Sequence, residues 1–192
     1  MELSPEEEKK IDLVKIAEIA VKLGFVPIPM INKVPFIPKW PQQKRETAVE
    51  KIRKSIKRTG LMIGIVTGVN SGVVVIDVDK RENGVEQWKQ IVSLNGLPET
   101  FTVLTPSGGY HYYFKYDDRT ATFHNGKIRG RGIDIRTTGG LIVFPGSKNH
   151  INNKYYTAIN GWVISTNNPE LQYVAIIATM PDWLFRLVQA DQ

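Results

Sequence analysis

The 192-residue sequence predicts an α+β fold. From residue 61 onward, short apolar runs recur between turn residues, a pattern typical of antiparallel strands. Helical periodicity is found mainly near the two ends of the chain, before residue 60 and after residue 169. Strands grouped in the middle of a chain with helices at its ends favour an α+β fold.

The first sixty residues predict two helices and one strand. Ser4-Pro5-Glu6 is a helix start, because serine caps, proline fits the first helical position and acids favour the first turn. The helical periodicity continues until Gly24 ends it. The apolar segment 25–30 contains prolines, which lack an N–H group, so we expect an edge strand there. A second, basic helix is predicted over 47–58.

Downstream of residue 60, one helix around 85–94 interrupts a series of short strands. The C-terminal part, from Pro169 to about 188, reads as helical and broken by Pro181. The predicted strands are 62–67, 72–79, 101–105, 110–116, 132–136, 141–145 and 155–159.

The composition excludes several kinds of protein. The chain has no cysteine, which excludes disulfides and cysteine-bound zinc and favours a cytoplasmic location. No apolar run approaches the ~18 residues of a membrane-spanning helix, and the acidic start is unlike the basic start of a signal peptide. A net charge of +6 and a pI of about 9.4 are compatible with a polyanionic partner without proving one.

The strand 72–79 is the most informative segment, because it ends in two acids one residue apart. Alternation along a strand places Val75, Asp77 and Asp79 on one face, with the two acids about 6–7 Å apart. Neighbouring anions repel unless a cation lies between them, and Mg²⁺ or Mn²⁺ prefers oxygen ligands. The alternative for this motif alone is an ordinary strand end whose aspartates face water.

A glycine turn followed by a histidine is the second candidate site. In Ser107-Gly108-Gly109, exposed backbone N–H groups could approach a phosphate closely. His111 follows on the next strand and could donate a hydrogen bond to phosphate oxygens. The alternative is a hairpin turn whose histidine packs locally.

The third candidate is Asp134, which lies between Ile133 and Ile135 and so shares a strand face with Arg136. One interpretation is that the two form a surface ion pair worth ~0–1 kcal/mol. The other is that Asp134 is a third metal-binding carboxylate and Arg136 a neighbouring cation that contacts a triphosphate. The surrounding segment is basic, which suits nucleic-acid phosphates but also describes a solvated face. Its six cations are Lys115, Arg119, Lys127, Arg129, Arg131 and Arg136, against three aspartates.

In this order, the three motifs resemble the bifunctional primase–polymerase (Prim-Pol) domains of the archaeo-eukaryotic primase (AEP) superfamily. Those domains show a strand ending in two acids, a small residue followed at the second position by histidine, and a hydrophobic residue followed by aspartate. Here the motifs are 75–79, Gly109-Tyr110-His111 and Ile133-Asp134. The resemblance covers roughly residues 10–188. We expect residues 1–192 to form a single catalytic domain, which could be the N-terminal part of a longer replication protein of a mobile element that also carries a helicase.

The resemblance implies an N-terminal α/β part packed on an antiparallel-rich sheet of the RNA-recognition-module (RRM) type, with the catalytic cleft between them. It also implies template-dependent transfer of a nucleotide to a 3′-hydroxyl with release of pyrophosphate. Two divalent ions about 3.5–4 Å apart serve such chemistry. The expected partners are a single-stranded DNA template, a primer, a dNTP or NTP, and Mg²⁺ or Mn²⁺, with no zinc and no membrane.

Each candidate residue has a role in this interpretation. The metal ligands would be Asp77, Asp79 and Asp134. The resemblance assigns His111 to the phosphates of the incoming nucleotide, while the turn beside it is shaped by Ser107, Gly108 and Gly109, and Arg136 is a further phosphate contact. Template phosphates could be held by Lys33, Lys39 and the cations of the helix 47–58, although a solvated basic face is an equally good interpretation.

Two alternative functions remain open on sequence grounds. A non-catalytic module could bind single-stranded nucleic acid on an RRM-like sheet, with Tyr112, Tyr113, Phe114 and Trp40 as stacking platforms. Three acids beside a phosphate path would oppose such binding in the absence of metal. A metal-dependent nuclease or nicking enzyme is the other alternative, but the second histidine usual in nicking enzymes is missing after His111.

Overall fold

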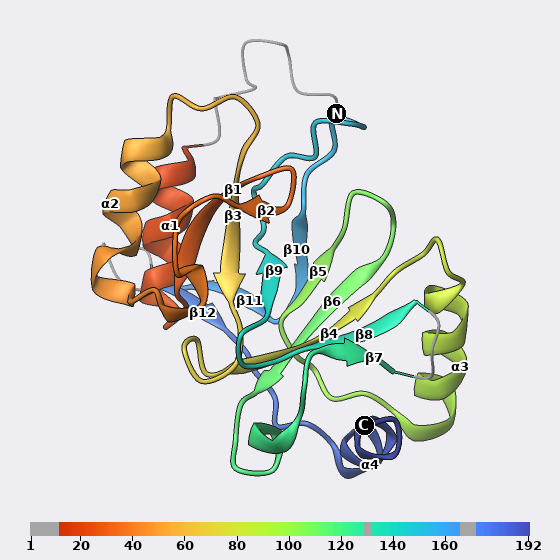
Figure 1. Ribbon diagram of the computed structural model, residues 1–192. Coiled ribbons are helices and arrows are strands. Elements are labelled where there is room, and N and C mark those ends of the chain that lie inside the picture. The colour runs from red at the N-terminus through yellow and green to blue at the C-terminus, as the bar shows by residue number, and fades with distance from the viewer. Residues whose placement is uncertain (1–11, 129–131, 166–171) are drawn as a thin grey trace.

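A computed structural model describes residues 12–128, 132–165 and 172–192, and it shows antiparallel sheets of four and six strands and a two-stranded ribbon, with helices on either side (Figure 1). Helices α1 and α2 pack together at one end of the molecule, and α3 and α4 lie at the other. The α+β class is confirmed. The helices are α1 (Leu13–Lys22), α2 (Arg45–Ser55), α3 (Gly84–Asn95) and α4 (Asp182–Ala190), with short 3₁₀ turns at Trp40–Gln42 and Thr120–Thr122.

The first helix begins at Leu13, because the extended residue Asp12 caps it. The Asp12 carboxylate accepts hydrogen bonds from the backbone N–H groups of Val14 and Lys15, which would otherwise lack partners. The predicted start at Ser4 lies outside the described residues.

The smaller sheet has four strands in the order β2-β1-β3-β9. Strand β1 pairs along its whole length with β3, while β2 pairs only with Met30 and Ile31. The prediction of an edge strand is therefore wrong, although the half of β1 that contains the prolines has a ladder partner on one side only. The strands are β1 (Pro27–Ile31), β2 (Val34–Pro35), β3 (Leu61–Val66) and β9 (Leu141–Val143).

The larger sheet has six strands in the order β10-β5-β6-β4-β8-β7, all antiparallel to their neighbours, with β4 between β6 and β8. The predicted strands of this sheet are present, with ends shifted by a few residues. Its strands are β4 (Val73–Val78), β5 (Thr102–Leu104), β6 (Tyr110–Lys115), β7 (Gly126–Lys127), β8 (Ile133–Arg136) and β10 (Thr157–Asn160).

The predicted helix beginning at Pro169 is wrong over residues 172–175. These residues form strand β12 (Gln172–Ala175), which pairs with β11 (Trp162–Ser165). The ladder to β11 is a non-local interaction that overrides local preference. Within residues 172–192, helix is found only after Pro181, as α4.

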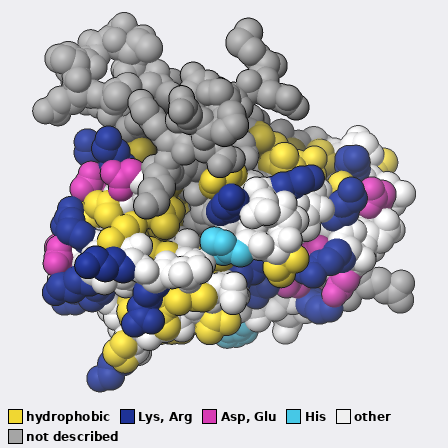
Figure 2. Space-filling view, turned by 90° about the horizontal axis from the view of Figure 1, so that it is seen from above, with side chains coloured by type: hydrophobic (Ala, Val, Ile, Leu, Met, Phe, Trp, Pro, Cys, Tyr) yellow, Lys and Arg dark blue, Asp and Glu magenta, His cyan; other side chains and the backbone are white. Residues whose placement is uncertain are grey.

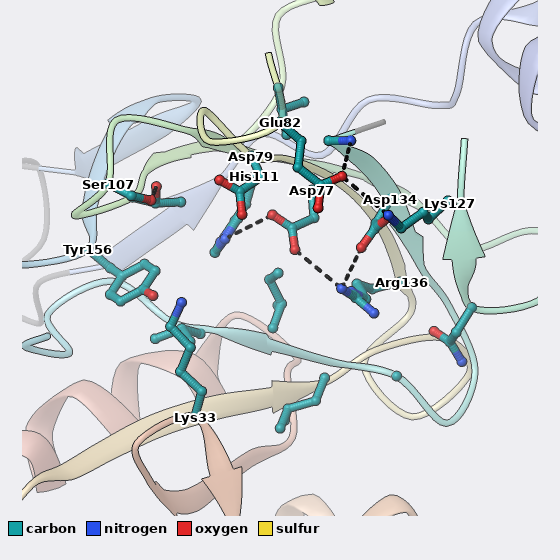
Figure 3. A pocket seen from close by; sticks show the side chains of 18 of the residues that line it. Lys33, Asp77, Asp79, Glu82, Ser107, His111, Lys127, Asp134, Arg136 and Tyr156 are labelled. Carbon is teal, nitrogen blue, oxygen red and sulfur yellow. Dashed lines mark hydrogen bonds and ion pairs between the residues drawn. The ribbon is translucent and has the colours of Figure 1, made fainter. Parts of the chain in front are cut away.

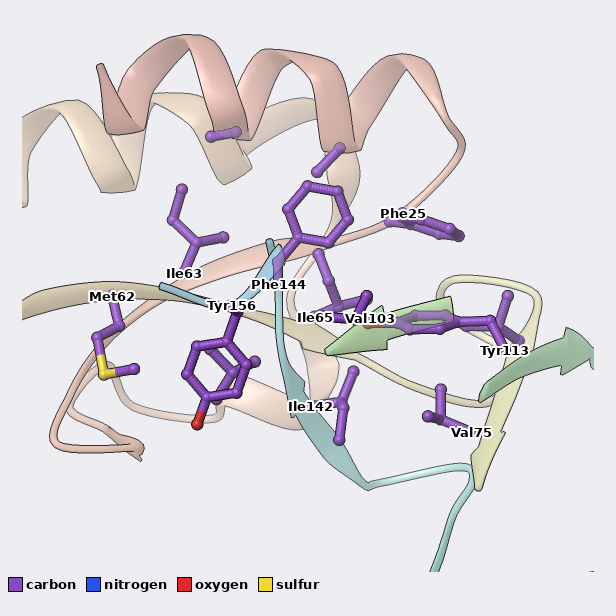
Figure 4. Close-up of a cluster of buried hydrophobic side chains, with 14 of the residues drawn as sticks. Phe25, Met62, Ile63, Ile65, Val75, Val103, Tyr113, Ile142, Phe144 and Tyr156 are labelled. Carbon is purple, nitrogen blue, oxygen red and sulfur yellow. The ribbon is translucent and has the colours of Figure 1, made fainter. Parts of the chain in front are cut away.

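Strand β4 is buried on both faces, and each face belongs to a different core. Val73 and Val75 join the core shared with the four-stranded sheet, α1 and α2 (Figure 4). Val74, Ile76 and Val78 join the core beneath α3 and α4. This alternation confirms the predicted faces of β4 and explains its nearly continuous apolar sequence.

Candidate active site

The register of the six-stranded sheet aligns residues from three predicted motifs. Asp77 on β4 lies directly opposite His111 on β6 and directly opposite Asp134 on β8. Residues paired across neighbouring antiparallel strands project from the same face. His111, Asp77 and Asp134 therefore form one row across three adjacent strands.

Burial on the other face fixes this register. Ile76, Ile133 and Ile135 are each 0% exposed in the core beneath α3 and α4. A one-residue slip of either strand would turn these side chains toward the acids and the acids into the core. The apolar neighbours in the sequence thus hold the polar row in place.

A pocket of about 500 Å³ lies over this row, between the two sheets (Figure 3). Six of the predicted site residues line it: Asp77, Asp79, Ser107, His111, Asp134 and Arg136. Gly108 and Gly109 do not belong to its lining. The walls contributed by the four-stranded sheet and its turns include Met30, Lys33, Leu141, Ile142 and Val143.

One arginine joins two of the acids. Nη2 of Arg136 lies 2.8 Å from Oδ2 of Asp134 and 3.6 Å from Oδ2 of Asp77. Burial raises the pKa of Asp134; Arg136 opposes this shift, and the neighbouring charge of Asp77 adds to it. The two carboxylates therefore already converge on one cationic atom.

Asp79 follows the end of β4 and is turned to a different arginine. Its backbone N–H donates to the carbonyl of Gly132 at 2.7 Å. Its carboxylate accepts from the Arg81 backbone N–H at 2.9 Å and from Nη2 at 3.0 Å. Burial raises the pKa of Asp79, but the hydrogen bonds from Arg81 outweigh it and hold this pKa below its usual value.

The donors suit a hard divalent cation, because carboxylate oxygens are the ligands that Mg²⁺ and Mn²⁺ prefer. Asp77 and Asp134 fit such an ion in the arrangement described above. Within residues 12–128, 132–165 and 172–192, no three acidic or histidine side chains are gathered closely enough to hold one ion. Asp79 would have to leave Arg81 to become the third ligand.

His111 is 4% exposed at the floor of the pocket. Its Nε2 lies 3.6 Å from Oδ1 of Asp77, and its ring is 5.7 Å from that of Tyr156. Burial lowers the pKa of His111, and the charge of Asp77 opposes this shift only in part. The imidazole is therefore neutral at neutral pH and can donate one hydrogen bond.

The glycine turn has a different role from the one predicted. The N–H groups of Gly108 and Gly109 donate to the carbonyl and the hydroxyl of Thr105, at 2.9 and 3.0 Å. The expectation that they are exposed for a phosphate is wrong. A Cβ at Gly109 would lie 2.2 Å from the carbonyl oxygen of Val78. Gly109 therefore permits the close approach of β6 to β4 that brings His111 opposite Asp77.

Two pocket residues, Glu82 and Tyr156, carried no sequence signal, whereas Lys33 was expected at template phosphates and lies at this pocket. Lys33 lies in the turn between β1 and β2, with its Nζ 5.9 Å from the centre of the Tyr156 ring. Glu82 accepts from Nζ of Lys127 at 3.2 Å and from the Gly132 N–H at 3.1 Å. Long-range pairing brings Glu82 and Tyr156 to the pocket, which explains why local patterns missed them. Two cations of the predicted basic cluster, Arg129 and Arg131, lie outside the described residues.

The description "Bifunctional DNA primase/polymerase, N-terminal" (Prim-Pol) is that of a family model that matches residues 17–183. The chain belongs to the Prim-Pol family. Membership implies a DNA primase/polymerase nucleotidyltransferase with nucleic-acid and nucleotide partners, and it suggests dependence on divalent metal. The search of curated proteins found no match to the chain. None of the helices in the described part of the chain is long and apolar enough to cross a membrane.

Aromatic side chains of this Prim-Pol sheet are not available as the stacking platform of a binding module. Tyr113 and Phe114 are each 0% exposed. Tyr112 packs on Trp88, with ring centres 5.2 Å apart. These rings stabilise the two cores, so the alternative function loses three of the four residues on which it depended.

Proposed function

We propose that this Prim-Pol chain is a template-dependent DNA primase or polymerase that transfers a nucleotide to a 3′-hydroxyl and releases pyrophosphate. The observation that carries the proposal is the row of His111, Asp77 and Asp134 on one sheet face, lining a pocket of about 500 Å³. A nucleotide-sized pocket with convergent carboxylates and cations suits phosphate chemistry.

Asp77 and Asp134 would hold Mg²⁺ or Mn²⁺, with Asp79 joining them after release from Arg81. When bound, such ions would neutralise charge on the reacting phosphates and favour ionisation of the 3′-hydroxyl. The chain itself supplies the alignment, because two adjacent strands hold the carboxylates of Asp77 and Asp134 opposite one another. Support for this assignment comes from Arg136, because its positively charged Nη2 contacts both carboxylates, as a metal ion bound between them would.

Cations and donors around the acids would hold the triphosphate. Arg136 can offer a planar, two-pronged contact to phosphate oxygens. His111 would donate its single N–H, and Ser107, whose hydroxyl lies 3.0 Å from that of Thr105, lines the same pocket. Gly108 and Gly109 would act by shaping the turn. Lys33, on the opposite wall, would add a further positive charge.

The substrates would be a primer on a single-stranded DNA template and a dNTP or NTP. Two predictions from the resemblance stay predictions. One is a helicase that acts on the same template, and the other is that residues 1–192 form a single catalytic domain.

Incorporation of labelled nucleotides tests the proposal. The protein is incubated with Mn²⁺ or Mg²⁺ on single-stranded DNA, with and without an annealed primer. Asp77→Ala and Asp79→Ala should each lower incorporation by more than about 100-fold, since changes merely next to metal ligands cost 10–100-fold. Asp118→Ala, at an exposed position, is the matched control and should retain activity. Full activity in Asp77→Ala would refute the metal assignment.

A further inference from the structure

Three loops beside the pocket carry cations that lie over aromatic rings. The guanidinium carbon of Arg58, after α2, is 4.6 Å from the ring centre of Phe36, after β2. Nζ of Lys148 is 5.6 Å from the ring centre of Tyr155, both between β9 and β10. Lys33 lies over Tyr156 at the pocket itself. We call Lys33, Phe36, Arg58, Lys148 and Tyr155 the cation–aromatic strip.

The loops of the strip are in contact with one another and with the pocket. A Cβ at Gly60, in the loop after α2, would lie 3.6 Å from the ring of His150 and 3.7 Å from the side chain of Ile31. The side-chain amide of Asn152 donates to the carbonyl of Pro106 at 2.9 Å, which joins the β9–β10 loop to the Ser107 turn. The strip is therefore continuous with the wall of the proposed nucleotide pocket.

Two cations of α2, Arg53 and Lys54, differ from those of the strip in their partners. On α2, Arg53 pairs with Glu18 and Glu50, and Lys54 pairs with Glu50. By contrast, Lys33, Arg58 and Lys148 form no ion pair with any described residue. Arg45 and Lys51 of α2 also lack an ion pair within the described part of the chain, but they donate to uncharged oxygens of Gly24, Gln43 and Thr47. The strip is therefore the better electrostatic match for a polyanion.

The sequence explains why this side of the molecule is basic. The segments 19–45, 51–76 and 135–169, which supply all the strip residues, contain no aspartate or glutamate. Figure 2 shows the molecule from above, with many Lys and Arg side chains across the face and most Asp and Glu side chains toward its left and right. Cations that lack an ion-pair partner and lie on segments free of acids create a positive potential that attracts polyanions. Lys33 also faces the acids of the pocket.

We propose that the cation–aromatic strip binds single-stranded nucleic acid and guides the template strand to the pocket, an inference that rests on the proposed function. Lys33, Arg58 and Lys148 would contact phosphates, while the half-buried rings of Phe36 and Tyr155 would stack on bases. A single strand offers both groups, whereas the bases of a duplex are stacked on each other and cannot use the rings.

The test measures binding of a fluorescent oligothymidylate of about 20 nucleotides, a length chosen because single-strand sites cover ~4–16 nucleotides. Anisotropy is recorded in EDTA without nucleotide, so that neither metal nor catalysis contributes. The double variant Arg58→Ala/Lys148→Ala should bind about tenfold more weakly or worse, and its salt slope should fall by about 1.4, at ~0.7 for each lost phosphate contact. Arg53→Ala/Lys54→Ala, which removes the same charge from α2, should bind within about twofold of wild type.

A third variant separates stacking from charge. Phe36→Leu keeps an apolar side chain but removes the ring, so we expect about fivefold weaker binding or more with an unchanged salt slope. Thermal unfolding of each variant verifies that the protein is folded. The proposal would be refuted if the two double variants lost equal affinity for the oligonucleotide. It would also be refuted if Arg58→Ala/Lys148→Ala bound the oligonucleotide as tightly as wild type.

The binding test of the strip and the incorporation test of the proposed function can fail independently of each other. If wild-type protein extends primers while the strip variants bind DNA normally, the strip is wrong and the polymerase assignment stands. If the strip variants lose binding while wild-type protein incorporates no nucleotide under any condition, the strip stands and the polymerase assignment is wrong.

Discussion

Replacing Arg136 with methionine isolates the repulsion between the two paired acids. The guanidinium contacts both carboxylates, at 2.8 Å for Asp134 and 3.6 Å for Asp77. Without it, two anions on directly opposed strand positions face each other at roughly 5–6 Å. At an effective dielectric of about 20 this repulsion is about 3 kcal/mol. Since the Asp77 and Asp134 side chains are 25% and 27% exposed, solvent screening lowers the expected loss of unfolding free energy to about 1–2 kcal/mol.

Manganese should reverse this loss. An ion that binds only the folded protein stabilises it by about 2.7 kcal/mol at a concentration of 100 times its Kd. In wild-type protein the guanidinium competes for the same oxygens, so Mn²⁺ should stabilise Arg136→Met more than wild type. Urea unfolding followed by tryptophan fluorescence, in EDTA and in Mn²⁺ and without nucleotide, measures both effects.

Arg119→Met is the matched control. Arg119 also joins two aspartates, Asp117 at 3.5 Å and Asp182 at 2.8 Å, but it lies away from the pocket. Its loss should destabilise the protein modestly, and Mn²⁺ should not restore stability. The reasoning fails if Arg136→Met is as stable as wild type in EDTA, or if Mn²⁺ acts equally on both arginine variants.

Three further changes test the local structure. Burial lowers the pKa of His111 below 6.5. The free energy of unfolding of the wild-type protein in EDTA should therefore fall as the pH drops below about 6.5, because the unfolded chain binds a proton there more readily than the folded chain does. His111→Gln should lose less unfolding free energy over the same pH range. Gly109→Ala should cost about 2–4 kcal/mol in urea unfolding, because its Cβ meets the Val78 carbonyl at 2.2 Å, whereas Gly126→Ala, with open space around it, should be nearly neutral. Tyr113→Phe removes a buried hydroxyl that has no hydrogen-bond partner among the described residues, so unfolding should show unchanged or slightly higher stability, by ~0–1 kcal/mol.

The faces of single strands were predictable from sequence, because alternation is a local property. The strand 72–79 gave the correct division between Val75 with Asp77 on one side and Ile76 on the other. The α+β class followed from the same local patterns. Helix α3 was also predicted to within a residue at each end.

Strand pairing and side-chain partners could not be predicted in this way. No local pattern says that Asp77 lies opposite His111 and Asp134, because that register depends on which apolar faces are buried together. The same holds for Asp79, whose partner Arg81 is two residues away but reaches it only through the turn after β4. The N–H groups of Gly108 and Gly109 looked available until the position of Thr105 was known.

Equilibrium binding of Mn²⁺, followed by the electron paramagnetic resonance of the free ion, tests the central claim most directly. We predict that Asp77→Asn and Asp134→Asn each weaken Mn²⁺ binding by at least about tenfold, while Asp117→Asn, outside the pocket, binds as wild type does. Wild-type affinity in both pocket variants would contradict the claim that these two strands hold a shared divalent ion.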